Sequence, residues 1–383
     1  MSVIKKRIGI VGGGQLGKMM ILEAKRLGFF VAIVDPTADC PAHSISDVHI
    51  VGGLDEAKAI NELAKLVDVI TYESEHINTD ALEALEKEGH IIYPSVKSLQ
   101  CIQNKFLQKQ ALKRSGLPVP KFEKVASVAE IKALADSDFG YPIMLKATTG
   151  GYDGKGNALI RSEAELESAF KALGGGSIEL MAEAFVDFAK EISLIACRGV
   201  AGTKVLYPLA ENIHKNSILD ISIVPARVSE RAIKKAEEIT DKIMDVFEGV
   251  GIFCAELFLT AEEEIYVNEV APRPHNSGHY TIEGCFASQF ENHIRAIVGL
   301  PFGCTELISP TVMVNLLGES DGEANLLGAE EAYLHPNVKI HLYGKFASKT
   351  ARKMGHFTVR DKSLEAALSR AEGLKKIVRI VGE

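Results

Sequence analysis

The sequence predicts an α/β and α+β protein with a parallel sheet at its N-terminus and two further domains of mixed structure. Three observations support this class. The chain has 383 residues, more than one hydrophobic core usually serves. Strand-like and helix-like runs alternate up to about residue 95, and glycine and prolines at residues 116–120 then end a helical stretch. We therefore expect domains over residues 1–103, 104–197 and 198–383.

The first domain is expected to consist of βαβ units. Its apolar runs predict strands at residues 8–11, 30–34 and 69–72 and a helix at residues 15–27. Strands that are joined through helices pair in parallel, so these runs predict a parallel sheet.

A glycine cluster follows the first predicted strand. Gly12, Gly14 and Gly17 match GxGxxG, and Asp35 ends the second strand near the distance of a ribose-binding acid. Alone, this pattern indicates NAD. Such glycines also let backbone N–H groups approach a substrate phosphate or carboxylate, and they form tight turns that bind nothing.

The second domain is predicted from shorter elements, which together form a small α+β lid. Helical spacing covers residues 98–115, and strands are expected at residues 141–146, 158–160, 179–186 and 192–196. Lys146 is followed by a loop with glycines at 150, 151, 154 and 156, which lacks the GKS or GKT ending of a Walker A loop. We expect this loop to cover phosphates, with Lys146 and Lys155 neutralising charge unless these lysines are merely solvated.

The third domain is expected to contain an antiparallel strand pair at residues 252–259 and 264–270. Helices at residues 229–247 and 285–298 would cover the sheet, and Ser363 would cap a last helix ending at residue 374.

Two carboxylates on this strand pair have apolar sequence neighbours. An unpaired carboxylate in such a setting is costly, so Glu256 and Glu269 are each expected to have a cation. Together with the amide oxygen of Asn268 they form a hard oxygen set suited to Mg²⁺. The structural alternative is a salt bridge to Arg273.

Residues 271–281, just beyond, are dense in hydrogen-bonding groups and contain two prolines. Arg273 can hold a carboxylate-like anion bidentately, while Asn276 and Ser277 offer neutral hydrogen bonds. His275 serves either as a general acid or base or as a residue that fixes the loop.

Composition excludes several classes of protein. The six cysteines are scattered and read as reduced thiols, and the net charge of −8 without a basic block argues against a nucleic-acid partner. No apolar run is long enough to cross a membrane, and the first residues lack the apolar core of a secretory signal. We expect a cytoplasmic protein.

Five segments resemble one known family: residues 13–17 (GGQLG), 150–156 (GGYDGKG), 268–279 (NEVAPRPHNSGH), 289–293 (QFENH) and 352–356 (RKMGH). The chain resembles, over essentially its whole length, the N5-carboxyaminoimidazole ribonucleotide synthetase family of ATP-grasp enzymes. The resemblance implies a three-domain ATP-grasp fold with an N-terminal pre-ATP-grasp domain. It also implies a homodimer that uses ATP, Mg²⁺ as one or two ions, bicarbonate and aminoimidazole ribonucleotide.

The resemblance and the glycine loop together assign a nucleotide site. Glu256 and Glu269 would bind magnesium, residues 183–186 would form an adenine hinge through their backbone, and Glu191 would take the ribose hydroxyls. The residues expected to contact ATP are Lys105, Lys146, Gly151, Tyr152, Asp153, Gly154, Lys155, Gly156, Glu183, Ala184, Phe185, Val186, Glu191, His214, Asn268 and Glu269.

A second set is implied for the imidazole nucleotide, whose phosphate would meet Lys345 and Arg352. The expected substrate-binding residues are Gly14, Gln15, Leu16, Asp35, Glu73, Tyr152, Asn276, Ser277, Lys345 and Arg352. The expected catalytic residues are Asp153 as base, Arg273 and His275 to position the carboxylating species, and Lys345. Two departures stand out: Lys349 replaces an expected arginine, and Ser74 replaces a bulkier apolar residue.

The implied reaction makes bicarbonate electrophilic by phosphorylating it with ATP, and the amine of the imidazole nucleotide then captures the carboxyl group. Three alternatives remain at this level. The nearest is a formate-dependent glycinamide ribonucleotide transformylase, the second is an NAD-dependent oxidoreductase, and the third is a nucleotide sensor without catalytic activity.

Overall fold

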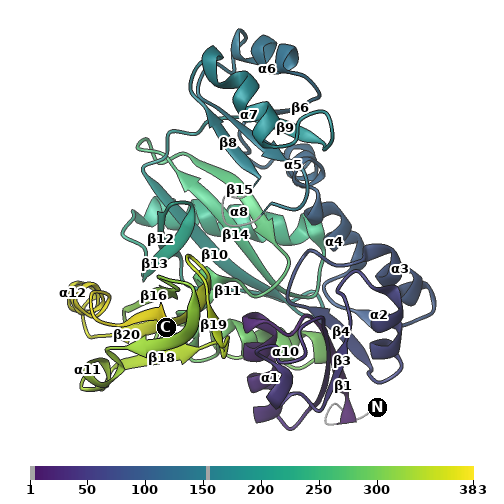
Figure 1. Ribbon diagram of the computed structural model, residues 1–383, viewed down its shortest axis with the longest axis vertical. Helices are drawn as coiled ribbons and strands as arrows, with labels where there is room; N and C mark the ends of the chain where they lie inside the picture. The colour runs from purple at the N-terminus through teal and green to yellow at the C-terminus, as the bar shows by residue number, and fades with distance from the viewer. Residues whose placement is uncertain (1–4, 152–155) are drawn as a thin grey trace.

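The computed structural model describes residues 5–151 and 156–383 (Figure 1). The first domain contains a five-stranded parallel sheet in the order β3-β2-β1-β4-β5, which confirms the predicted class for this region. Its elements are β1 (Arg7–Val11), α1 (Gln15–Arg26), β2 (Phe30–Asp35), β3 (Val48–Val51), α2 (Ala57–Ala64), β4 (Val69–Tyr72), α3 (Thr79–Lys87) and β5 (Ile91–Ile92).

The expected helical stretch at residues 98–115 is two helices, α4 (Val96–Gln103) and α5 (Lys105–Arg114). Asn104 separates them with an extended backbone (φ −103°, ψ 109°), and its side chain accepts hydrogen bonds from the N–H groups of Phe106 and Leu107 at 3.0 and 3.1 Å. This is an N-cap, which apolar spacing alone does not reveal. As a result, Lys105 is the first residue of α5 rather than an interior residue.

The small lid domain has a four-stranded sheet in the order β6-β9-β7-β8. Its elements are β6 (Phe122–Val125), α6 (Val128–Ala135), β7 (Ile143–Ala147), β8 (Asn157–Ile160), α7 (Leu166–Ala172) and β9 (Leu180–Ala184). The strand expected at residues 192–196 was wrongly placed in this lid. It is part of β10 (Lys190–Arg198), which pairs with β14 along its whole length in the large sheet.

The large sheet follows the order β15-β14-β10-β12-β13-β16-β20-β18, with β11 paired to β10. The predicted antiparallel pair is confirmed as β14 and β15. These strands are β11 (Lys204–Leu206), β12 (Ala210–Lys215), β13 (Ile218–Val224), β14 (Gly251–Leu259), β15 (Ile265–Ala271), β16 (Thr311–Leu317), β18 (Val338–Leu342) and β20 (Lys353–Arg360).

Helices cover both faces of this sheet. Leu194, Phe253 and Ala255 belong to the core that α8 (Glu230–Phe247) covers. Alternate residues, Ile195 and Cys254 among them, face the core beneath α10 (Gln289–Val298). Because side chains alternate along a strand, Glu256 lies on the α10 face, two residues beyond Cys254.

The remaining elements complete the C-terminal region. Ser363 caps α12 (Leu364–Leu374) as predicted, accepting a hydrogen bond from the Ala366 N–H at 3.2 Å. The others are α9 (Thr281–Gly284), β17 (Gly322–Leu327), α11 (Ala329–Tyr333), β19 (Ala347–Ser348) and β21 (Arg379–Gly382). Within the described residues, none of the helices has the length and apolarity that crossing a membrane requires.

Candidate active site

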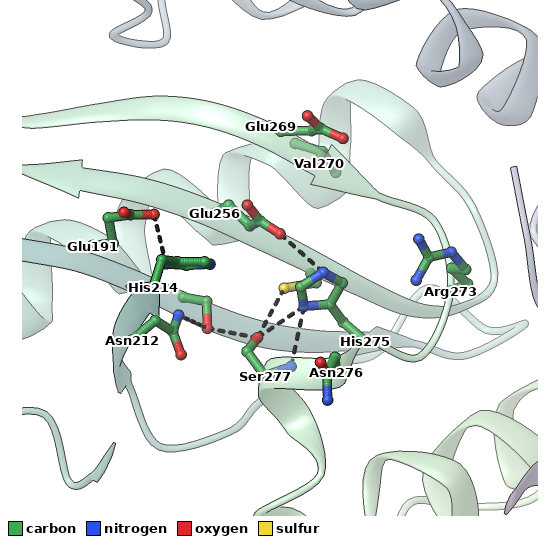
Figure 2. A network of polar contacts seen from close by, with 12 residues as sticks. Glu191, Asn212, His214, Glu256, Glu269, Val270, Arg273, His275, Asn276 and Ser277 are labelled. Carbon is green, nitrogen blue, oxygen red and sulfur yellow. Dashed lines mark hydrogen bonds and ion pairs between the residues drawn. The ribbon is translucent and has the colours of Figure 1, made fainter. Parts of the chain in front are cut away.

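Glu256 and Glu269 face each other on neighbouring strands (Figure 2). They are register partners in the β14–β15 pair, and the register shifts directly after them, so that Leu257 pairs with Val267 and Asn268 is an extra residue. Such a bulge breaks the alternation of side chains. Consequently Asn268 and Glu269 are both partly exposed while Val267 and Val270 on either side are buried, and three oxygen-bearing side chains gather at one place.

Two lysines from elements outside the β14–β15 pair lie next to this acidic pair. Lys105 of α5 forms an ion pair with Glu269. The Lys146 ammonium lies 3.4 Å from the Asn268 amide oxygen and 2.7 Å from Glu183. The site therefore joins β7 and β9 of the lid to β15 of the large sheet.

Lys109 completes a buried charge cluster that the sequence did not reveal. Its ammonium lies 2.6 Å from Glu183 and donates to the Val267 carbonyl at 3.0 Å. Lys109 and Glu183 are each 2% exposed and Lys146 is 7% exposed. Burial, together with the neighbouring Lys146 ammonium, lowers the pKa of Lys109 to about 8, although Glu183 acts in the opposite direction. Despite burial, the two lysines lower the pKa of Glu183 to about 2. The unbalanced positive charge suits an anionic ligand.

The predicted adenine hinge is partly committed to the protein itself. The side chain of Glu183 holds two lysines, and the N–H groups of Ala184 and Phe185 donate to the carbonyls of Lys121 and Pro142 at 2.8 and 3.3 Å. A base that binds here through the hinge backbone must use carbonyl groups or Val186. Close by, Phe188 stacks on Phe258 at 4.6 Å, an aromatic platform that the sequence analysis missed.

Glu191 and His214 form a pair across strands β10 and β12, with the Nδ1 atom of His214 3.0 Å from the carboxylate. Burial opposes charge on His214, but Glu191 outweighs it and raises the pKa of the imidazole. The carboxylate of Glu191 is partly exposed and lies on the same side of the sheet as Glu256 (Figure 2).

His275 donates toward Glu256, with Nε2 and Oε1 2.9 Å apart. Two neighbouring residues that the sequence analysis expects to bind substrate, Ser277 and Asn276, form hydrogen bonds within the chain. Ser277 is 1% exposed and lies 2.9 Å from Nδ1 of His275. Asn276 exchanges two hydrogen bonds with Asn315, at 2.8 and 3.0 Å. Through these contacts, both residues stabilise the conformation of the loop that carries His275.

Arg273 forms a bidentate ion pair with Glu75, at 2.6 and 2.9 Å. The alternative of a salt bridge from Arg273 to Glu256 or Glu269 is therefore not what the structure shows. Although partial burial opposes its charged form, Arg273 lowers the pKa of the Glu75 carboxyl to about 2. A cavity of about 250 Å³ lies alongside, lined by Glu75, His76, Gln103 and Gly150 among others.

The first glycine loop already holds a carboxylate of the chain itself. Glu73 accepts hydrogen bonds from the N–H groups of Gly14 and Gly17, both at 2.6 Å, and Asp35 accepts one from Gly13 at 2.8 Å. These donors are the ones a dinucleotide phosphate would need. The NAD interpretation of GxGxxG is thus unsupported, and Glu73 and Asp35 present the remaining acceptor capacity to a ligand.

Lys345 and Arg352 lie on the C-terminal region that borders the first domain. Lys345 donates to the Lys353 carbonyl at 2.7 Å, and the exposed Arg352 donates to the Ala347 carbonyl at 2.9 Å. Lys18 of α1, which the sequence analysis missed, donates to the Tyr343 carbonyl at 3.1 Å. This contact brings Lys345 near the helix that begins with Gln15 and the buried Leu16.

Part of the predicted site lies outside the described residues: Tyr152, Asp153, Gly154 and Lys155. The loop ends that are described, Gly151 and Gly156, flank this segment, and the Gly156 carbonyl accepts a hydrogen bond from Ala147 N–H at 2.8 Å.

Family models match the chain in three consecutive segments. The ribonucleotide synthetase preATP-grasp domain matches residues 5–103, and the ATP-grasp domain matches residues 110–290. The phosphoribosylaminoimidazole carboxylase C-terminal domain matches residues 311–370. Together with the paired acids and their lysines, these matches define the protein as an ATP-grasp ligase.

Whole-chain relatives narrow the class. N5-carboxyaminoimidazole ribonucleotide synthase of Bacillus subtilis is 45% identical over 352 residues, 92% of this chain and 90% of the relative. The Staphylococcus aureus N315 protein of the same name is 42% identical over 92% of each chain. This chain belongs to the N5-carboxyaminoimidazole ribonucleotide synthase family.

Similar solved structures support the same family assignment. The Thermotoga maritima N5-carboxyaminoimidazole ribonucleotide synthetase has a TM-score of 0.90 and 46% identity, covering 99% of this chain and 100% of that one. An Aspergillus clavatus enzyme in complex with ADP and 5-aminoimidazole ribonucleotide has a TM-score of 0.89 and 36% identity, covering 98% of both chains.

Proposed function

We propose that this ligase carboxylates 5-aminoimidazole ribonucleotide with bicarbonate and ATP in de novo purine biosynthesis, giving N5-carboxyaminoimidazole ribonucleotide, ADP and phosphate. The observation that carries the proposal is the facing pair Glu256 and Glu269, set against Lys105 and Lys146 from two other elements. The complex of the Aspergillus clavatus relative with ADP and the aminoimidazole nucleotide supports the same pair of ligands.

The residues present fit magnesium and ATP. Two carboxylates and the Asn268 amide form an oxygen donor set, to which phosphate oxygens would add further ligands for one or two Mg²⁺ ions. Bound magnesium would offset negative charge during phosphoryl transfer. Lys105 and Lys146 would hold the phosphates, Glu191 the ribose hydroxyls, and the backbone near Val186 with the Phe188–Phe258 platform the base.

The imidazole nucleotide is assigned to the edge of the first domain. Asp35 and Glu73 are acceptors, which suits ribose hydroxyls or an amine rather than a phosphate. The phosphate is assigned to Lys345 and Arg352, in the C-terminal region that contacts α1 through Lys18 and the Tyr343 carbonyl.

The proposed binding sites for ATP, bicarbonate and the imidazole nucleotide suggest the following chemical steps. An oxygen of bicarbonate attacks the γ-phosphorus of ATP, the bond to the ADP oxygen breaks, and carboxyphosphate forms. The exocyclic amine then attacks the carboxyl carbon, phosphate leaves, and Asp153 accepts the amine proton. Arg273 and His275 hold the carboxylating species, since both present N–H donors next to Glu256 and Glu75. We further propose a cytoplasmic homodimer.

The test is a coupled assay of ADP release with aminoimidazole ribonucleotide, with and without bicarbonate. Bicarbonate labelled with ¹⁸O should transfer one labelled oxygen to the inorganic phosphate, because the attacking oxygen stays on phosphorus. Formate with glycinamide ribonucleotide is the control for the neighbouring ligase activity. ADP release that depends on formate, or unlabelled phosphate, would reject the proposal.

A further inference from the structure

Helix α10 lies between the first domain and the large sheet, and it carries a histidine that contacts both. Figure 1 shows α10 next to α1 of the first domain. Phe290, Ile294 and Ile297 of α10 share a hydrophobic core with strands β1, β2 and β4 of that domain. His293, among these apolar residues, is 0% exposed. It ends the family-like segment at residues 289–293, and the proposed reaction has so far given it no role.

The two ring nitrogens of His293 contact different domains. Nε2 lies 2.8 Å from the hydroxyl oxygen of Thr71 on β4, and Nδ1 lies 3.1 Å from the backbone nitrogen of Ile252 on β14. Gly251, directly before Ile252, has a φ of +110°, and a Cβ atom there would lie 2.9 Å from the Nδ1 atom of the ring. The ring therefore packs against the backbone of β14 where glycine leaves room for it.

The direction of both hydrogen bonds is fixed by the backbone. An N–H group of the main chain can only donate, so Nδ1 of His293 accepts from Ile252 and the ring proton must be on Nε2. Nε2–H then donates to the oxygen of Thr71. Burial favours this neutral ring, because it lowers the pKa of His293 to about 3. Thr71 and Ile252 are also 0% exposed, so water does not compete for either bond.

Both strands that His293 contacts lead into the proposed site. Thr71 is two residues before Glu73 and four residues before Glu75, and both acids follow the last residue of β4. Ile252 is four residues before Glu256 on β14. β4 and β14 belong to different sheets, and His293 joins them through its two hydrogen bonds. The histidine thus connects the residues assigned to the imidazole nucleotide with those assigned to magnesium and ATP.

We propose that His293 is a positioning residue for carboxyl transfer: by joining β4 to β14, it aligns the amine of the imidazole nucleotide with the carboxylating species. The inference rests on the proposed function. Phosphoryl transfer is assigned to the acidic pair and its two lysines, whereas carboxyl transfer also needs the first domain. A misplacement of about 1 Å can slow a reaction about 100-fold. Without the link, water would hydrolyse carboxyphosphate to bicarbonate and phosphate, and ATP would be consumed without product.

Thr71→Val tests the link, because it removes the acceptor of Nε2–H with little change in shape and leaves the bond to Ile252 in place. With all substrates present, ADP is measured by a coupled assay and the carbamate formed from ¹³C-bicarbonate by ¹³C NMR. The ratio of ADP to carbamate should rise at least about 10-fold above wild type. Thr71→Ser keeps the hydroxyl and should stay within about twofold of wild type. Thr240→Val is the matched control, because Thr240 is 1% exposed and its hydroxyl has no hydrogen-bond partner within the part of the chain that the structure describes.

The outcomes separate this inference from the proposed function. A wild-type ratio in Thr71→Val, or an equal fall in both rates, would overturn the positioning role, whereas a wild-type protein that forms no carbamate would reject the proposed function itself. Long-range ¹H–¹⁵N NMR of the wild-type protein at pH 7 tests the link without substrates or variants, with His293 assigned through its own backbone signals. We expect a protonated Nε2 and an unprotonated Nδ1. A protonated Nδ1 would show that His293 does not accept from β14 and would overturn the inference.

Discussion

Glu183 is the single carboxylate between two buried ammonium groups, and Glu183→Gln removes that charge with almost no change in shape. Removing one partner of a buried ion pair typically costs about 3–5 kcal/mol, because the other charge stays behind without compensation. The lowered pKa of Lys109 indicates that burial and the nearby Lys146 already destabilise the charged form of this lysine. A fall from 10.5 to about 8 corresponds to about 3 kcal/mol at pH 7. We therefore expect the variant to lose about 3–5 kcal/mol of unfolding free energy.

The assay is urea unfolding followed by far-UV circular dichroism, since the chain has no tryptophan. The loss should have a defined pH dependence. Glu183 has a lowered pKa of about 2 in the folded state against 4.5, so its contribution is complete above pH 4.5. It declines as the pH falls from 4.5 toward 2, where wild type and variant should converge.

Lys109→Met provides the matched partner for a double-mutant cycle. Adding it to Glu183→Gln removes one uncompensated ammonium, and the double variant should regain at least about half of the lost stability. The reasoning is refuted if Glu183→Gln unfolds within about 1 kcal/mol of wild type at pH 7, or if the double variant is no more stable than the single one.

Three further variants address other parts of the site. Glu269→Gln removes a proposed magnesium ligand and should lower ADP release at least about 100-fold with an unchanged circular dichroism spectrum; retained turnover would exclude the metal role. Glu75→Gln weakens the bidentate hold on Arg273 and should change the KM for bicarbonate at least about fivefold with the KM for ATP unchanged, as checked by initial rates. Gly17→Ala would place a Cβ atom 2.6 Å from the Gly12 carbonyl, whereas Gly373→Ala meets nothing within 4 Å. The first should raise the KM for aminoimidazole ribonucleotide at least about tenfold, and equal values for both variants would contradict the assignment.

Apolar periodicity predicted the parallel first domain and the β14–β15 pair, because both depend on local alternation. It could not show that β10 pairs with β14 in the large sheet rather than with the strands of the lid, because strand pairing depends on contacts between residues far apart in sequence. The break at Asn104 was also hidden, although an asparagine before a helical run is a capping signature. The domain boundaries at residues 103 and 197 remain predictions.

For the site, the sequence supplied the residue types, and the structure supplied their partners. Asn268 and Glu269 are adjacent, so in a regular strand they would face opposite sides, and only the bulge brings them together. Lys109 had one usable indication, its i,i+4 spacing from Lys105 on the same helix face. Glu75 had none, because its partner Arg273 is far away along the chain. The roles in ATP and substrate binding remain proposals.

The carboxylate of Glu73 occupies the N–H donors of the first glycine turn, and this has a consequence for which anions the turn can bind. A pyrophosphate that approached this turn would meet the negatively charged Glu73 carboxylate instead of free N–H donors. To bind, it would have to displace Glu73 from its two hydrogen bonds with the Gly14 and Gly17 N–H groups. We therefore expect Glu73 to disfavour dinucleotide binding through repulsion rather than through shape. In this chain, the acid that directly follows the neighbouring parallel strand therefore argues against a phosphate site at the glycine turn, although the glycine spacing alone favours one.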